Sequence, residues 1–288
     1  MPIDLHTHST ASDGTVPPGV LPELGAAAKL TALALTDHDT VAGLSDFMAR
    51  GKDFPEMELI PGIEFSSHDS ARELHIVGLY IDPENPELLA MIDSMRRSRQ
   101  VRGELMMQKL AALGYTVTLD ELIAVGAPPD APGRPHFAQV LVNKYNFPDN
   151  KTVFERLLKR GLPGYVPREL PPPEDVIKVI KAAGGLAIWA HPFNTRHSMN
   201  NYIRRTANLL KIAGLDGLEA YYTEYTPSKR DNALRIADEL DLIVSGGSDF
   251  HGTIHPEVKL GKGTGSLNVP DEILAFLHRA REPKVVFC

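Results

Sequence analysis

The chain has 288 residues, of which 43% are hydrophobic and 23% charged, and its formal net charge is −7 at pH 7. This length suits two small domains or one large α/β barrel, and the composition is that of an ordinary globular protein. The net acidity argues against duplex DNA as a partner, but it leaves room for a local basic pocket that binds a small phosphorylated substrate.

The chain holds one cysteine, Cys288. A single cysteine excludes an intramolecular disulfide and a CxxC zinc site, and it is typical of a reducing compartment. The segment MPIDLHTH lacks the basic and apolar regions of a signal peptide. No apolar run approaches the roughly 18 residues of a membrane span. We therefore expect a cytoplasmic protein without membrane contact.

Short apolar runs alternate with longer helical patterns along most of the chain, which is typical of repeated β/α units. Helical periodicity appears between the later runs, at residues 174–183, 228–240 and 271–281. The apolar runs predict seven strands, at residues 2–6, 32–36, 58–64, 73–80, 186–190, 216–221 and 242–247.

Residues 94–165 break this rhythm, because they carry only helical patterns separated by proline and glycine clusters. We therefore predict a small all-helical subdomain at 94–165. It would be inserted after the fourth strand of an α/β barrel made of residues 1–93 and 166–288. We expect the insert to cover the barrel mouth and to shield the site from bulk water.

Titratable side chains mark the ends of most predicted strands. Parallel strands bring their carboxyl ends to one face of a barrel, where barrel enzymes keep their catalytic residues. Six of the eleven histidines map to this face, whereas the helices are nearly free of histidine. The residues placed there are His6, His8, Asp13, Asp37, His38, Asp39, Glu64, His75, His191, Glu219, Asp249 and His251.

Imidazole and carboxylate ligands without thiolates suit Mn²⁺, Zn²⁺ or Fe²⁺. The set is larger than one ion can hold, and two or three neighbouring metals are typical of phosphoester hydrolysis. We therefore predict two to three divalent ions, with manganese as the expected metal and zinc or iron as alternatives.

Six separated segments resemble the motifs of a known family. They are DLHTHST, LTDHDT, PGIEFS, ELHIVGLY, AHP and SDFHG, in this order along the chain. In order and spacing they resemble the PHP domain, the polymerase-and-histidinol-phosphatase group of amidohydrolase-like enzymes. The resemblance covers the whole chain outside the insert, and it implies a distorted (β/α)₇ barrel with a trinuclear metal centre.

The same resemblance implies three metal sites, in which Glu64 serves two ions as a bridge. The implied ligand sets are His6, His8, Glu64 and Asp249, then Glu64, His75 and His191, and finally Asp13, His38 and His251. Asp37, Asp39 and Glu219 fall outside these sets. Either aspartate could orient an imidazole or cap a loop, and the sequence leaves both roles open.

The stretch GRPHFAQVLVNKY, residues 133–145, is the most informative part of the insert. Pro135 suits the first position of a helix, so Arg134 and His136 would lie at a helix N-terminus. Such a terminus favours an anion, and Arg134 could bind phosphate in bidentate fashion, although it could equally pair with a carboxylate of the barrel. The GRPHFA pattern also resembles the PHP subgroup that hydrolyses 3′,5′-nucleoside bisphosphates, whose relatives trim short oligoribonucleotides from the 5′ end.

We therefore expect a metal-dependent phosphomonoesterase that removes the 3′-phosphate from nucleoside 3′,5′-bisphosphates, with a metal-bridging hydroxide as the nucleophile. Glu64, Asp249 and His191 are the expected catalytic residues, and Arg134 and His136 the expected substrate-binding residues. Exonucleolytic cleavage of short RNA and hydrolysis of histidinol phosphate are alternatives in the same chemistry. A metal-binding protein without catalysis is the alternative from another class, and the oligomeric state stays open.

Overall fold

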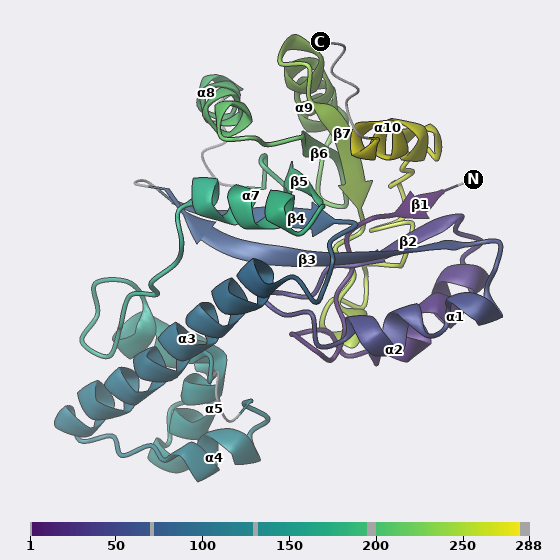
Figure 1. Cartoon of the computed structure of the whole chain (residues 1–288). Helices are drawn as coiled ribbons and strands as arrows, with labels where there is room; N and C mark the ends of the chain where they lie inside the picture. The colour runs from purple at the N-terminus through teal and green to yellow at the C-terminus, as the bar shows by residue number, and fades with distance from the viewer. Residues whose placement is uncertain (1, 70–71, 129–131, 195–199, 283–288) are drawn as a thin grey trace. The chain divides into compact units, whose positions relative to one another are not determined.

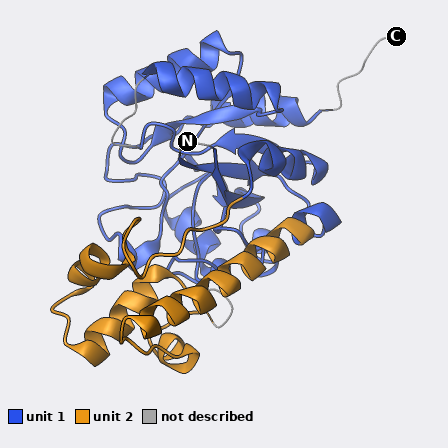
Figure 2. Ribbon diagram, turned by 90° about the vertical axis from the view of Figure 1, so that its left-hand side faces the viewer, with its two compact units in different colours: residues 1–89, 171–288 blue, residues 90–170 orange. Residues whose placement is uncertain are grey.

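The structure is a computed structural model that describes residues 2–69, 72–128, 132–194 and 200–282. Cys288 lies outside the described residues. The chain divides into two compact units, one formed by residues 1–89 and 171–288 and the other by residues 90–170 (Figure 2). The second unit contains the segment 94–165, for which the sequence predicts only helices.

The first unit is built on a sheet whose strands follow one another in chain order from β1 to β7 (Figure 1). Near the seam between the first and last strands, the Leu5 amide donates to the Gly246 carbonyl at 3.1 Å, and Thr7 forms a parallel bridge with Phe250. The predicted seven-stranded, nearly closed α/β barrel is therefore confirmed. The strands are β1 (Ile3–Asp4), β2 (Ala32–Leu35), β3 (Glu58–His68), β4 (Glu73–Leu79), β5 (Leu186–Trp189), β6 (Gly217–Tyr222) and β7 (Ile243–Gly247).

Strand β4 is the distortion in this barrel, because it runs antiparallel to both β3 and β5 while the other neighbouring pairs are parallel. The expectation that every strand ends at the same face is therefore wrong for β4. The connection from His68 to Glu73 is too short for the crossover that a parallel pair requires, so the chain must turn back. This reversal places His75, near the start of β4, beside Ser66 of β3.

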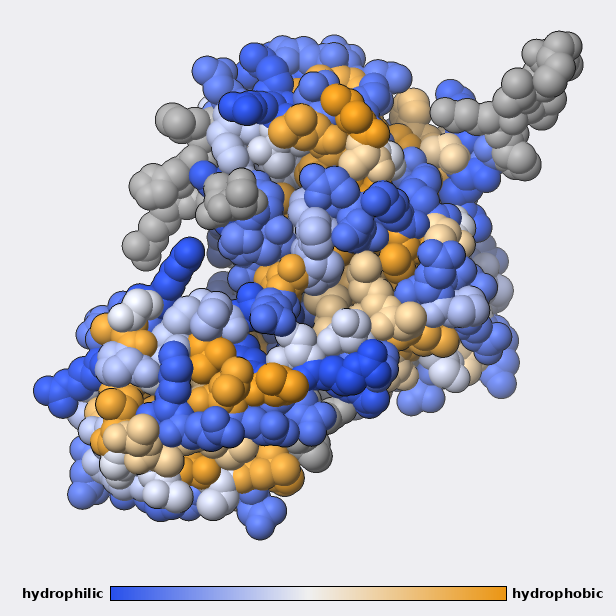
Figure 3. Space-filling model, turned by 60° about the vertical axis from the view of Figure 1, so that its left-hand side comes forward, coloured by the Kyte–Doolittle hydropathy of each residue, from blue (hydrophilic) through white to orange (hydrophobic). Residues whose placement is uncertain are grey.

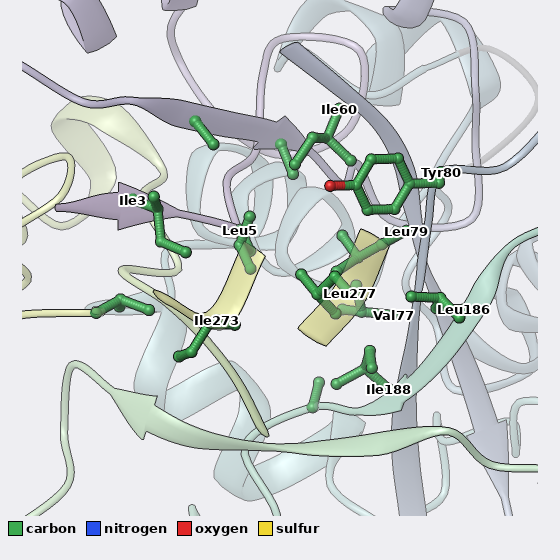
Figure 4. Packing of buried hydrophobic residues seen from close by; sticks show 14 residues of the cluster. Ile3, Leu5, Ile60, Val77, Leu79, Tyr80, Leu186, Ile188, Ile273 and Leu277 are labelled. Atoms are coloured by element: carbon green, nitrogen blue, oxygen red, sulfur yellow. The ribbon is translucent and has the colours of Figure 1, made fainter. Parts of the chain in front are cut away.

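The apolar interior of the barrel lies around the C-terminal helix α10 (Glu272–Arg281). Figure 4 shows Ile273 and Leu277 of this helix between side chains of the first strand and those of β4 and β5. Leu277 is fully buried, as are Ile3 and Leu79. Burying a side chain of this size stabilises the fold by about 1.5–3 kcal/mol relative to leaving it in water.

Helix α7 shows how the sequence sets the limits of the outer helices. It begins with Pro173, whose missing N–H has no partner in a first turn, and Glu174 and Asp175 follow where the helix dipole favours acids. It stops before Gly184, which adopts a φ of 71°. The other helices of this unit are α1 (Leu21–Ala27), α2 (Leu44–Met48), α8 (Asn200–Ile212) and α9 (Pro227–Glu239), with 3₁₀ turns at Pro18–Val20, Gly51–Asp53 and Gly252–Ile254.

The second unit is a helical bundle with its own core. Helix α3 (Pro86–Ala112) leads into α4 (Leu119–Ala124), α5 (Arg134–Tyr145) and α6 (Asn150–Val153), and a π-helical turn follows at Phe154–Leu158. Buried side chains of this core include Leu110 on α3 and Phe137 on α5. Among the described residues of this unit, 90–128 and 132–170, there are helices and loops but no strand.

The surface carries no extended apolar belt on the face drawn in Figure 3, where hydrophobic residues form small groups between hydrophilic ones. Exposed apolar side chains such as Ile212 on α8 and Phe276 on α10 belong to helices whose other faces are buried. In the part of the chain that the structure describes, no helix is both long and apolar enough to cross a membrane.

Candidate metal centre

The barrel brings the predicted metal ligands together in three overlapping groups, and the ligand atoms of each group lie within 4.8 Å of one another. Glu64 does not end its strand as expected, because β3 continues to His68. His191 is the remaining predicted ligand, and its Nε2 lies 3.0 Å from Oε1 of Glu64. Every predicted ligand therefore belongs to one cluster in the first unit. The three groups are His6, His8, Glu64 and Asp249, then His38, Glu64 and His75, and finally His8, Asp13, His38 and His251.

Glu64 is the centre of this cluster. It is fully buried on β3, and both of its carboxylate oxygens face imidazole nitrogens. Oε1 lies 3.0 Å from Nδ1 of His75 and 3.0 Å from Nε2 of His191. Oε2 lies 3.0–3.3 Å from nitrogens of His6, His8 and His38. One carboxylate thus faces two sets of ligands, which is the geometry that a bridging ligand requires.

Several buried polar atoms in the cluster make no well-aligned hydrogen bond among the described residues, although Oε2 of Glu64 lies within 3.3 Å of three imidazole nitrogens. The atoms without such a bond are Nε2 of His6, both ring nitrogens of His8, Nδ1 of His38 and Oε2 of Glu64. A buried polar atom without a partner is costly, and such atoms are rare in native proteins. Converging lone pairs of imidazole and carboxylate are what a divalent cation of the Mn²⁺, Zn²⁺ or Fe²⁺ type binds. The residues present therefore fit a site for more than one such ion.

Glu219, inside β6, contacts two of the candidate ligands. Its Oε1 lies 3.2 Å from Nδ1 of His6, and its Oε2 accepts a hydrogen bond of 2.8 Å from the backbone N–H of His191. A proton on Nδ1 of His6 leaves the Nε2 lone pair directed at Glu64. The sequence places Glu219 near a strand end but gives it no role, because a carboxylate that binds a metal and one that orients a ligand look alike in a sequence.

Asp249 is held by groups from both sides. The hydroxyl of Tyr222 donates to Oδ2 of Asp249 at 2.8 Å, and Nδ1 of His251 donates to the Asp249 carbonyl oxygen at 2.8 Å. The other carboxylate oxygen of Asp249 lies 3.1 Å from Nε2 of His8. Tyr222 therefore fixes a candidate ligand, and sequence reasoning missed it because a tyrosine at a strand end carries no distinctive signal.

The two aspartates that fall outside the implied ligand sets, Asp37 and Asp39, anchor loops. Asp37 accepts hydrogen bonds from the backbone N–H and the hydroxyl of Ser9, at 2.7 and 2.6 Å, and from the hydroxyl of Ser12 at 2.6 Å. Asp39 accepts from the backbone N–H and the hydroxyl of Ser66, at 2.8 and 3.2 Å. The sequence leaves open whether these aspartates orient an imidazole or cap a loop, and their hydrogen bonds are those of a loop cap.

Asp4 joins the two ends of the barrel at its seam. It is fully buried and accepts hydrogen bonds from the backbone N–H and hydroxyl of Ser248, at 2.8 and 2.6 Å, and from the backbone N–H of Gly261 at 2.7 Å. Burial raises the pKa of Asp4 to about 6, although these hydrogen bonds favour its ionised form. The carboxylate holds the loop after β7 against the strand that carries His6.

Three site residues adopt the left-handed backbone conformation that usually favours glycine. Asp39, His191 and Asp249 have φ values of 52°, 32° and 55°. Each such residue costs of order 1 kcal/mol and persists only where surrounding contacts fix it. All three lie just after a strand, where the chain must turn sharply.

The close packing of carboxylates and imidazoles perturbs their titration. Burial acts to lower the pKa of both His8 and His75, but nearby carboxylates outweigh it and raise these pKa values to about 9 and about 10. Burial lowers the pKa of His38 to about 4, and the charge of Glu64 only partly offsets this effect. Burial opposes ionisation of Glu64, yet the surrounding histidines hold its pKa well below the usual range. The carboxylate therefore stays charged, as a metal ligand must.

Arg134 and His136 lie in the second unit, at the start of α5 as expected. Nδ1 of His136 accepts a hydrogen bond of 3.0 Å from the backbone N–H of Gly133, so this nitrogen is unprotonated and the ring proton lies on Nε2. The guanidinium carbon of Arg134 lies 5.8 Å from the ring centre of Phe154 and 5.7 Å from that of Tyr165. Two donor side chains thus lie at one helix terminus, where the N–H groups of Gly133 and His136 are already hydrogen-bonded and Pro135 has none.

Histidines and carboxylates gathered at one end of a barrel, where barrel enzymes keep their active sites, are typical of metal-dependent hydrolases. The chain belongs to the PHP-domain family, since the family model described as PHP domain matches residues 4–159. The resemblance drawn from the six motifs is therefore confirmed, and the protein is a metal-dependent phosphoesterase of this family.

Individual relatives match along most of the chain. A 5′-3′ exoribonuclease from Haemophilus influenzae is 36% identical over 252 residues, which cover 86% of this chain and 89% of that protein. A 3′,5′-nucleoside bisphosphate phosphatase from Chromobacterium violaceum is 36% identical over 254 residues, which cover 86% and 87%. The structure of an amidohydrolase from Chromobacterium violaceum, with bound sulfate and no metal, superimposes with a TM-score of 0.79 at 32% identity, covering 98% of this chain and 97% of that one.

Proposed function

We propose that the enzyme removes the 3′-phosphate from nucleoside 3′,5′-bisphosphates, such as adenosine 3′,5′-bisphosphate, and leaves the 5′-monophosphate. The observation that carries this proposal is that two donor side chains, Arg134 and His136, lie together at the start of α5, in a compact unit other than the one with the metal ligands. In this proposal they form a second anion-binding group, and a substrate with two phosphates on one ribose would bind with one phosphate at each group. A relative with 36% identity bears the name of this activity.

In this proposal the nine clustered residues are the metal ligands, manganese is the metal, and Glu64, Asp249 and His191 surround the reacting phosphate. Bound divalent ions would supply an activated water and neutralise charge on the phosphoryl oxygens. The chain itself supplies orientation, because Glu219 directs His6 and Tyr222 directs Asp249. The full ligand set is His6, His8, Asp13, His38, Glu64, His75, His191, Asp249 and His251.

The second unit would supply Arg134 and His136 to the 5′-phosphate. That phosphate does not react, so its binding free energy can position the 3′-phosphate for attack. The neutral ring of His136 keeps its proton on Nε2, from which it can donate to a phosphate oxygen while Nδ1 stays tied to Gly133.

The test is the replacement Arg134→Ala. We expect kcat/KM for adenosine 3′,5′-bisphosphate to fall by roughly 10- to 100-fold or more, the loss expected for a charge-assisted hydrogen bond of about 1.5–3 kcal/mol. For adenosine 3′-monophosphate, kcat/KM should change little. Arg160→Ala, at an exposed arginine of the same unit, is the matched control. Equal losses on both substrates would mean that Arg134 does not bind the second phosphate.

Cleavage of short RNA from the 5′ end is the second candidate, because relatives with 36% and 33% identity are named 5′-3′ exoribonucleases. The same 5′-phosphate group would bind at Arg134 in both reactions. Comparing kcat/KM for adenosine 3′,5′-bisphosphate and for a 5′-phosphorylated tetraribonucleotide separates the candidates. The bisphosphatase proposal requires the mononucleotide to be the better substrate.

A further inference from the structure

A cavity of about 370 Å³ opens beside two of the proposed metal ligands in the first unit. Its volume lies within the range of small-molecule binding sites. Its wall includes His75 and His191 together with Arg72, Trp189, Asn194 and Tyr202. A phosphate held at His75 and His191 would therefore leave the rest of its molecule at the entrance of this cavity.

Two residues of the wall, Arg72 and Tyr202, stack on each other. The guanidinium carbon of Arg72 lies 3.8 Å from the centre of the Tyr202 ring. Asp69 holds both members, because its Oδ2 accepts a hydrogen bond of 3.0 Å from the Tyr202 hydroxyl and its Oδ1 accepts one of 2.7 Å from the Arg72 backbone N–H. The pair is thus set in place before any ligand arrives.

The chemistry of the wall favours a flat aromatic ligand over a second anion. Arg72 and Glu73 carry opposite charges in the same wall, so the cavity has no excess positive charge to select a phosphate. Leu74, Trp189 and Pro192 supply apolar surface, and the amide of Asn194 supplies a polar edge. Planar guanidinium and aromatic groups are the surfaces on which proteins stack nucleobases.

We infer that this cavity binds the nucleobase of the substrate, which stacks on the pair formed by Arg72 and Tyr202 while its sugar phosphate reaches His75 and His191. This inference rests on the proposed nucleotide phosphatase function and adds a site for the base. Stacking depends on the face of a base and little on the hydrogen-bonding groups at its edge, so the enzyme accepts all bases. It binds purines more tightly than pyrimidines because their stacking surface is larger.

The first test measures binding without catalysis. Trp189 is the one tryptophan of the chain and lines the cavity, so its fluorescence reports occupancy. Adenosine 5′-monophosphate, the proposed product, is titrated into the metal-loaded enzyme with excitation at the red edge of the tryptophan band, and ribose 5-phosphate is the ligand without a base. We expect a saturable change with the nucleotide only, and an equal change with ribose 5-phosphate would overturn the inference.

Two replacements of Arg72 separate stacking from charge. Arg72→Ala and Arg72→Lys should both weaken nucleotide binding by roughly 10-fold or more, because neither keeps the planar face. Arg205→Ala, at an exposed residue of α8, should leave binding unchanged. If Arg72→Lys binds the nucleotide as tightly as the wild type, the cavity recognises charge and the inference is overturned. Retention of wild-type binding by Arg72→Ala overturns it as well.

The second test compares adenosine 3′,5′-bisphosphate with ribose 3,5-bisphosphate, which lacks the base. Arg72→Ala should raise KM for the first substrate by roughly 10-fold or more and leave the second unaffected. Equal effects on both would overturn the base site while the phosphatase proposal stands. If the wild type releases phosphate from neither compound, the phosphatase proposal fails, and the fluorescence titration still decides whether the cavity binds a base.

Discussion

Replacing Glu219 by Gln tests whether this buried carboxylate orients two of the candidate ligands. A glutamine keeps the volume but offers only one acceptor oxygen, whereas Glu219 faces donors on both sides, His6 Nδ1 and the His191 N–H. If the new NH₂ group faces His6, it donates to Nδ1 and moves the ring proton to Nε2, the nitrogen that faces Glu64. If it faces His191, two donors point at each other. The first orientation therefore reverses the hydrogen bond that sets the tautomer of His6, and the second removes the one that holds the His191 backbone.

The expected loss of metal affinity is roughly 10- to 100-fold, the effect typical of removing a hydrogen-bond partner of a metal-bound histidine. This corresponds to about 1.4–2.7 kcal/mol. Competition with a chromophoric chelator measures the Mn²⁺ affinity, and circular dichroism confirms that the variant is folded. Glu224→Gln, at an exposed glutamate two residues past the end of β6, is the matched control. A folded Glu219→Gln protein that binds Mn²⁺ within twofold of the wild type would refute the reasoning.

Glu64→Gln should leave less than one Mn²⁺ per chain after metal loading and should abolish most phosphate release, since both oxygens of Glu64 face ligand sets; elemental analysis giving two ions per chain would contradict the bridging role. Leu277→Ala should lower the free energy of unfolding by about 2–5 kcal/mol in denaturant titrations, while the exposed Leu209→Ala should cost less than about 0.5 kcal/mol. Burial lowers the pKa of His136 below its unfolded value of 6.5, so its contribution to stability is present above that pH and lost as the pH falls through the folded pKa. The protection factors for hydrogen exchange in the first turn of α5, which correct for the intrinsic pH dependence of exchange, should therefore fall on acidification in the wild type, whereas His136→Gln, which keeps a cap without a titrating ring, should show no such step.

The barrel strands and the candidate ligands could be predicted because both are encoded locally. An apolar run such as ALAL at residues 32–35 is a buried strand, and the histidine and carboxylates that follow it stand where that strand ends. The direction of β4 was not predictable in the same way, since ELHIVGL has the same apolar pattern whichever way it runs. Only the connection from His68 to Glu73 indicates the direction of β4, because it is too short for the crossover that a parallel strand would need.

Other features depend on neighbours that are distant in the sequence. The contact between Glu219 and His6 joins residues 213 positions apart, and it exists because the seam of the barrel places β1 beside β7. Helices α1 and α2 have only seven and five residues, too few for a helical period to stand out. Tertiary packing, rather than local pattern, decides such elements.

The hydrogen bond between Asp4 and Ser248 joins residues 244 positions apart, so it can form only late in the synthesis of this segment. His6 and His8 leave the ribosome long before Asp249 and His251, which complete their groups. The barrel cannot close along its seam until both segments are available, and contacts of such long range form slowly. A nascent chain therefore displays histidines that can bind a metal loosely, but the complete centre can assemble only after Asp249 and His251 have been translated.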